Sequence, residues 1–282
     1  MVKVIAPGFF STIQDLGRMD YQEYGVPYSG VMDRYSAKLA NALLGNDKND
    51  ALLEITMTGP KLQFDCDTYI VITGADMSPR HNGISIKQTH VVKIKPGDAL
   101  SFGRLQFGFR GYLAVLGGLQ SELVMHSRSM YNGITKQHKI NKGDVLTIAP
   151  PSKVIQETNA TIKTNANHFI GNRIEVYKGP EFEYLTEKQQ NKLLSTEFTI
   201  SKDNSRMAYQ LEEVLVNDLQ PIITSLVLPG TVQLTPSGKL IILMRDCQTT
   251  GGYPRVLQLK GASINVFSQK FTNNKIHFNL ID

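Results

Sequence analysis

The chain has 282 residues, 41% of them hydrophobic and 20% charged, which is typical of a soluble protein with one large or two moderate cores. Its formal charge of +5 comes from 30 basic and 25 acidic residues that are scattered rather than clustered, which argues against nucleic-acid binding. No apolar run is long enough for a signal peptide core or a membrane span. We therefore expect a cytoplasmic protein without nucleic-acid or membrane contact.

The chain is expected to begin with a short strand over residues 2–6. A polar stretch over residues 9–18 follows; it has no clean period of 2 or 3.6 and forms either a loop or a broken strand. Within this stretch, Asp15 and Arg18 are three residues apart. They either pair with each other or bind a ligand.

Apolar residues recur at helical spacing from about 30 to 44, and Gly45 is expected to end this helix. Ser29 is the expected N-cap, and Asp33 lies in the first turn. A helix N-terminus favours anions, so these two side chains either only cap the helix or also help to bind a ligand.

The next part of the chain is predicted to be a series of short strands separated by Gly- and Pro-containing turns. This spacing is typical of a barrel or a sandwich. The expected strands are 52–56, 61–64, 69–73, 90–94, 99–102 and 110–116.

Two carboxylates in this region are candidate site residues. Glu54 lies between apolar neighbours, so it either faces solvent on an edge strand or finds a partner, for which Arg128 and Tyr131 are candidates. Asp76 follows an apolar strand in a loop of small residues, where it either forms a turn or contributes to a site.

Residues 151–171 are the predicted linker, because this stretch is poor in bulky apolar residues and rich in Thr, Asn, Lys and Pro. We therefore predict an N-terminal β-rich lobe over residues 1–150 and a C-terminal β-rich lobe over residues 172–282. The second lobe is expected to contain a helix at about 181–194 and strands at 173–177, 198–200, 225–228, 232–234, 240–244, 255–259 and 275–280.

The polar loop 245–254 follows the apolar strand 240–244 and contains Arg, Asp, Gln, Thr and Tyr side chains beside two glycines. The glycines let a partner approach the backbone closely. The loop either forms a tight turn or holds a small polar substrate.

Several common motifs are missing from the sequence. It has no phosphate-binding loop, no H-E-x-x-H, no G-x-S-x-G and no G-x-G-x-x-G, and its six histidines and two cysteines show no metal-ligand spacing. We predict no metal site. No methionine is followed by lysine, so any biotin would be carried by another chain.

Motif-like segments run along nearly the whole chain: 7–8 with 14–18, 25–33, 41–46, 54–60, 73–76, 127–128, 205–207 and 248–254. In this order they resemble the biotin-dependent carboxyltransferase, allophanate hydrolase subunit 2-like family. That family includes the C subunit of bacterial 5-oxoprolinase and part of the carboxyltransferase region of urea carboxylase. The sequence departs from the family's pattern at Ala208 and Asp20, where glycine is common.

The resemblance implies a mainly β fold with a few helices, built as two cyclophilin-like β-barrel lobes. It also implies that the chain is the C subunit of a complex that opens 5-oxo-L-proline to L-glutamate with ATP, together with the A and B subunits. The site would be shared with the homologous B subunit, with ATP acting at the level of the complex and biotin only through a separate carrier. The alternatives are a regulatory protein that sequesters a kinase inhibitor resembling the B subunit, and the carboxyltransferase component of a biotin-dependent urea or amide carboxylase.

Candidate catalytic residues are Asp15, Arg18, Asp76 and Gln248. We expect Arg18 and loop 248–252 to bind a carboxylate or oxyanion, and Asp15 or Asp76 to orient substrate N–H groups or act as a base. Segments 14–18 and 248–252 would then line one cleft. The expected substrate contacts are Gln14, Ser29, Asp33, Glu54, Arg128, Thr249, Thr250, Gly251, Gly252 and Tyr253.

Overall fold

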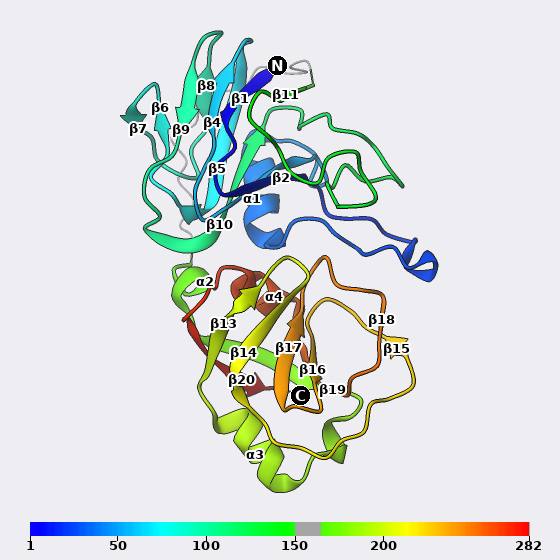
Figure 1. Ribbon diagram of the computed structural model, residues 1–282. Helices are drawn as coiled ribbons and strands as arrows, with labels where there is room; N and C mark the ends of the chain where they lie inside the picture. Colours follow the sequence, from blue (N-terminus) through cyan, green and yellow to red (C-terminus); the bar gives the residue numbers. More distant parts are fainter. Residues whose placement is uncertain (150–164, 282) are drawn as a thin grey trace. The chain divides into compact units, whose positions relative to one another are not determined.

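The computed structural model describes residues 1–149 and 165–281, and the chain divides into two compact units (Figure 1). Unit 1 comprises Met1–Arg18 and Ser29–Phe169, and unit 2 comprises Met19–Tyr28 and Ile170–Asp282. Both are built mainly from strands, which confirms the predicted fold class. Most of the predicted linker falls on residues 150–164, which lie outside the described residues, so the domain boundaries stay a prediction. Within the described ranges, no helix has both the length and the apolar character of a membrane span.

Unit 1 contains two sheets with an apolar core to which both contribute. Alternation along the strands explains this core, because every second side chain points to the same face. One sheet has the order β11 (Val145–Leu146), β1 (Val2–Ala6), β4 (Lys61–Phe64), β9 (Ala99–Ser101), β6 (Arg80–His81) and β7 (Ile84–Ser85). The other has the order β2 (Phe10–Gln14), β3 (Leu52–Thr56), β10 (Phe107–Val115), β5 (Thr68–Asp76) and β8 (Val92–Ile94).

Helix α1 (Arg34–Leu44) packs on strands β5 and β10 of the five-stranded sheet. Leu44 of the helix joins Leu52 and Val71 in a second apolar cluster, on the face opposite the main core. The helix begins later than predicted. Its N-cap is Asp33, whereas Ser29 lies upstream with a φ of 54°, outside the helical region, so the predicted cap was wrong.

Residues 10–14 form strand β2, which is fully paired with β3, so the broken-strand alternative for residues 9–18 is the one that the structure shows. One strand prediction in unit 1 was wrong in part. Strand β5 continues through Gly74 to Asp76, so Asp76 ends a strand instead of following one. Gly74 makes this possible: its φ is 81°, and a Cβ there would lie 2.5 Å from the Arg110 carbonyl oxygen.

Unit 2 contains a closed barrel of seven strands, visible in Figure 1. Their order is β12 (Arg173–Lys178), β19 (Arg255–Leu259), β16 (Thr231–Leu234), β17 (Lys239–Leu243), β14 (Ala208–Val214), β13 (Phe198–Asn204) and β20 (Lys275–Leu280). A separate ribbon pairs β15 (Ser225–Leu226) with β18 (Thr250–Gly251). Sequence periodicity missed strand β14 and helix α4 (Gly261–Ser268).

The predicted helix at about 181–194 is shorter in the structure. Helix α3 (Glu187–Ser195) begins after Thr186, which forms a capping box with Gln189, and a short 3-10 helix, η2 (Phe182–Tyr184), precedes it. The capping box satisfies the first N–H groups of the helix and fixes its start. Helix α2 (Asn167–Ile170) is a single turn.

Candidate functional site

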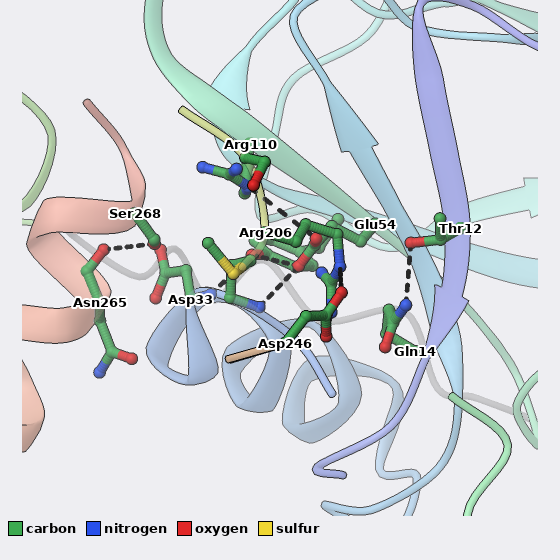
Figure 2. Close-up of polar contacts among 12 residues, drawn as sticks. Thr12, Gln14, Asp33, Glu54, Arg110, Arg206, Asp246, Asn265 and Ser268 are labelled. Carbon is green, nitrogen blue, oxygen red and sulfur yellow. Dashed lines mark hydrogen bonds and ion pairs between the residues drawn. The ribbon is translucent and has the colours of Figure 1, made fainter. Parts of the chain in front are cut away.

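A buried carboxylate network lies on the α1 side of the five-stranded sheet in unit 1. Strand register places Thr12, Glu54 and Tyr112 side by side across β2, β3 and β10. Glu54 is 1% exposed and accepts hydrogen bonds from the Met32 N–H (2.7 Å) and the Tyr112 hydroxyl (2.9 Å). Arg110 Nε lies 3.9 Å from the Glu54 carboxylate, an ion pair that Figure 2 marks with a dashed line. Glu54 thus has buried partners on an interior strand rather than a solvent-facing position on an edge strand, and the Arg128 guanidinium bonds elsewhere, to Ser121 and Gln120.

Tyr112 connects Glu54 to Asp33. Its hydroxyl accepts the Asp33 N–H at 2.8 Å while it donates to Glu54. Burial, and then the nearby Glu54 and Asp33 carboxylates, raise the pKa of Tyr112 well above its ordinary value. The hydroxyl consequently stays protonated and remains a donor.

Asp33 has more partners than a helix cap needs. Its carboxylate accepts from the N–H groups of Tyr35 and Ser36 and from the Ser36 hydroxyl. It also lies 2.7 Å from His168 Nε2, and the His168 side chain is 10% exposed. This Asp–His pair fixes the orientation of the imidazole ring.

Asp15 ties two loops together. Its carboxylate accepts hydrogen bonds from Gly17 N–H, the Ser127 and Ser129 hydroxyls, and Arg128 N–H, at 2.6–2.8 Å. Four donors surround the carboxylate, so this geometry favours a role in fixing the loops over a role as a proton acceptor.

Arg18 is completely buried, and its guanidinium donates to the carbonyl oxygens of Val124 (3.2 Å) and Ser129 (2.6 Å). These bonds hold the segment 14–18 against residues 124–129. Close packing holds the other side of the segment: a Cβ at Gly30, whose φ is 83°, would lie 2.6 Å from Gly17 N.

Gln14 and Ser29 are both fully buried. The Gln14 amide donates to Thr12 Oγ1 and to the Met130 carbonyl oxygen, both at 3.1 Å, and Figure 2 shows the first of these bonds. Gln14 Oε1 and Ser29 Oγ are buried and have no hydrogen-bond partner among the residues that the structure describes. Both predicted contacts thus keep hydrogen-bonding capacity.

Arg128 lines a cavity of about 310 Å³ in unit 1. Its guanidinium donates to the Ser121 carbonyl oxygen and, at 2.7 Å, to Gln120 Oε1, so the side chain forms part of the wall. Asp76 lies elsewhere in the unit and accepts the Ser78 N–H at 2.8 Å, which makes it the strand-end turn residue that the sequence left open as an alternative. The other residues that line the cavity are Ile13, Gln120, Ser121, Glu122, Met130, Thr135, Lys136, Gln137, Val145, Leu146 and Thr147.

The remaining candidates lie in unit 2. Gln248 and Thr249 precede strand β18, which contains Thr250 and Gly251 and pairs with β15. The Gly252 carbonyl accepts from Ile222 N–H at 2.9 Å, and the Tyr253 side chain is 40% exposed. Near the start of this loop, Asp246 forms a two-bond ion pair with Arg206 at 2.8 and 3.0 Å (Figure 2).

Residues 24–280 match the family described as "Carboxyltransferase domain, subdomain A and B". The chain belongs to this family. It is 31% identical to the C subunit of 5-oxoprolinase from Escherichia coli over 284 residues, which cover 99% of this chain and 90% of that protein.

Two solved structures share the fold of this chain. The crystal structure of TTHA0988 has a TM-score of 0.87 at 26% identity, and the match covers 99% of this chain and 55% of that one. The urea amidolyase of Kluyveromyces lactis also has a TM-score of 0.87 at 26% identity, over 100% of this chain and 19% of that one. The chain thus spans about half the length of the first solved relative and a smaller part of the second.

Sequence reasoning missed several polar residues of this chain that the fold buries. Arg110 and His168 contact the candidate residues Glu54 and Asp33, and Gln233 in β16 is 2% exposed. Lys270, two residues after α4, is 4% exposed, and burial lowers its pKa to about 8. A charged residue inside the apolar strand 110–116 was a usable signal for Arg110, as Glu54 was for its own strand. The contact of His168 with Asp33 spans 135 residues and left no local signal.

Proposed function

We propose that this chain is the C subunit of a 5-oxoprolinase-type complex, which opens 5-oxo-L-proline to L-glutamate in an ATP-dependent reaction together with the A and B subunits. The observation that supports this most is end-to-end similarity: the match to the Escherichia coli 5-oxoprolinase protein covers 99% of this chain and 90% of that protein. The matches to larger urea-processing relatives cover small parts of those chains, for example 19% of the urea amidolyase.

The chemical task is to break a stable cyclic amide. An amide carbonyl becomes reactive when an electrophilic group, carboxyl or phosphoryl, is placed on it and preorganised donors stabilise the oxyanion that forms. We assign substrate recognition to Gln248 and the segment 249–252, because Gln248 keeps a buried oxygen without a hydrogen-bond partner in the described chain. Asp15 and Arg18 then position segment 14–18 through the hydrogen bonds already described.

ATP and biotin belong, in this proposal, to the complex rather than to this chain. The segment 14–18 does not form a phosphate-binding loop, because the Gly17 N–H donates a hydrogen bond to the Asp15 carboxylate instead of pointing toward a ligand. The absence of a phosphate loop and of a Met-Lys pair in the sequence agrees with this assignment. We expect two partner proteins, the homologous B subunit in direct contact and the A subunit in the larger complex, and a small amide or lactam as substrate.

The test is reconstitution. This chain is mixed with the A and B subunits from the same source, and ATP-dependent glutamate release from 5-oxo-L-proline is measured with and without it. We expect release from the three-protein mixture and none when this chain is omitted. Equal release in both mixtures would remove the catalytic role. Formation of a stable pair with the B subunit without any release would favour the regulatory alternative.

A second function is supported by the fold match to the urea amidolyase, with a TM-score of 0.87 over the whole of this chain. In that case the chain is the carboxyltransferase component for urea or another amide, with biotin on a separate carrier. The two functions are separated when urea replaces 5-oxo-L-proline, a biotinylated carrier protein with its biotin carboxylase and bicarbonate is added as the carboxyl source, and carboxylated product is measured.

A further inference from the structure

Two glutamine side chains in unit 2 converge at one glycine. Gln233 lies in barrel strand β16, and Gln248 lies in the loop between β17 and β18. A Cβ placed on Gly251 would be 2.6 Å from Gln233 Nε2 and 3.5 Å from Gln248 Nε2. Both carboxamides therefore rest against the same residue, which has no side chain that would displace them.

Each carboxamide has an unused hydrogen-bonding atom. Gln233 Nε2, a donor, and Gln248 Oε1, an acceptor, are buried and have no partner among the described residues. A buried polar group without a partner destabilises the fold, so folded proteins rarely keep one without a reason. Two such atoms on neighbouring side chains, one a donor and one an acceptor, form a complementary pair.

The charged side chain beside Gln233 on the neighbouring strand is already paired. Arg255, the register partner of Gln233 on strand β19, is held by Glu181 through two hydrogen bonds and donates further to Ser225 Oγ. Its charge is therefore already matched. The apolar residues Val227 and Cys247 border the same region. A neutral polar ligand suits this environment better than an anion.

We infer that Gln233 and Gln248 recognise the edge of a cis amide. Gln233 Nε2 donates to the ligand carbonyl oxygen, and Gln248 Oε1 accepts the ligand N–H. An open-chain secondary amide is trans and presents these groups on opposite sides, whereas a ring holds the amide cis and presents both on one edge. A lactam substrate has this edge, and so has the ureido ring of biotin. The inference rests on the proposed function for the first of these ligands.

Gly251 acts as a positioning residue for the pair. Any side chain at this position would push against the Gln233 carboxamide, because 2.6 Å is well inside contact distance. Gln248 is only half-buried, so the pair borders the protein surface, and a ligand approaches from the Gln248 side.

Two variants of equal size and charge test the donor and acceptor roles separately. Gln233→Glu replaces the donor with a carboxylate that faces the ligand carbonyl, whereas Gln248→Glu keeps an acceptor for the ligand N–H. Dissociation constants for 5-oxo-L-proline and for biotin are measured by titration calorimetry on the full chain in complex with the B subunit. Circular dichroism and thermal unfolding check that both variants fold.

We expect Gln233→Glu to weaken binding of the ligand that uses this edge by about tenfold or more, and Gln248→Glu to change it by less than about threefold. A third measurement needs no variant: wild-type protein binds N-methyl-5-oxo-L-proline at least about tenfold more weakly than 5-oxo-L-proline, because the methyl group removes the N–H. If only biotin binding depends on Gln233, the glutamine pair recognises the amide edge of biotin rather than that of the substrate.

If Gln233→Glu and Gln248→Glu lose affinity for the ligand equally, the inference is overturned, because a purely structural role of the two residues predicts equal losses. Two other results also overturn the inference. In the first, the wild-type complex binds neither 5-oxo-L-proline nor biotin. In the second, the N-methyl compound binds as tightly as 5-oxo-L-proline and biotin binding does not depend on Gln233. These failures are distinct from failure of the proposed function. A complex that releases glutamate but shows no Gln233 dependence keeps the function and loses only the recognition pair, whereas absent glutamate release counts against the function alone.

Discussion

Glu54 in unit 1 and Gln233 in unit 2 are almost equally buried, with 1% and 2% of their surface exposed, but they use their polar atoms differently. Glu54 accepts from a backbone N–H and a tyrosine hydroxyl and lies beside an arginine. Gln233 keeps a buried donor without a partner in the described chain. Burial of a polar residue therefore does not identify a binding site by itself. Its unused hydrogen-bonding capacity does.

The largest effect is expected from breaking the satisfied network. Glu54→Ala removes the acceptor that the Tyr112 hydroxyl and the Met32 N–H share, and it removes the buried carboxylate beside Arg110. Removing one partner of a buried charged group costs about 3–5 kcal/mol. We expect a loss of that size in the free energy of unfolding, measured by urea denaturation.

Two controls sharpen this prediction. Glu54→Gln keeps an oxygen acceptor and should cost clearly less than the alanine variant. Glu213→Ala removes a half-buried carboxylate in unit 2 that accepts two hydrogen bonds from Thr199, and it should cost about 1 kcal/mol. A Glu54→Ala loss no greater than that of Glu213→Ala would contradict the view that this network stabilises unit 1.

A smaller loss is expected at Asp15. In Asp15→Asn, one side-chain oxygen becomes an NH₂ group, which then faces donors such as the Ser127 hydroxyl or the Arg128 N–H. Two donors that face each other leave buried groups without a hydrogen bond, which lowers the free energy of unfolding by about 1–3 kcal/mol. Thermal unfolding measures the change. The matched control is Asp76→Asn, where the carboxylate accepts one N–H, from Ser78, and the effect should stay within about 0.5 kcal/mol.

The sequence predicted most strands of both units, because alternation of apolar side chains is a local signal. Strands β3, β4 and β19 begin and end at the predicted residues. Strand β14 was missed, since Ala208–Val214 alternates weakly and carries two glutamates. Local pattern fails where neighbouring strands, rather than the segment itself, decide the conformation.

The candidate site was less predictable for a related reason. The motifs pointed to Gln14, Asp15 and Gln248, but whether each has spare hydrogen-bonding capacity depends on contacts across the fold. Three of the four donors to the Asp15 carboxylate come from residues more than 100 positions away. The expected cleft between segments 14–18 and 248–252 stays a prediction, as do the individual catalytic roles.

An acid-dependent effect is expected in unit 2. Hydrogen bonds from Arg255 lower the pKa of Glu181 below its ordinary value of 4.5. Since the folded-state pKa is the lower one, the pair stabilises the protein above about pH 4.5, and this contribution is lost as the pH falls through the folded-state value. Glu181→Gln should therefore be less stable than wild type at pH 7 and approach it in acid.

Unfolding midpoints measured from pH 7 down to pH 3 check this difference. The matched control is Glu175→Gln, which breaks the exposed pair with Lys260 and should show little change at either pH. A gap between wild type and Glu181→Gln that grows in acid would contradict the assigned sign.

The smallest effect concerns the two thiols, one in each unit. Burial, reinforced by Asp246, raises the pKa of Cys247 to about 12, so this thiol is almost entirely protonated at pH 8 and should resist iodoacetamide. Cys66 is only half-buried and should be alkylated, as mass spectrometry of digested protein would show. Cys247 directly precedes Gln248, so its labelling also reports on the glutamine pair. Labelling of Cys247 as fast as Cys66 would mean that the loop opens often, and protection by an added ligand would then locate that ligand beside Gln248.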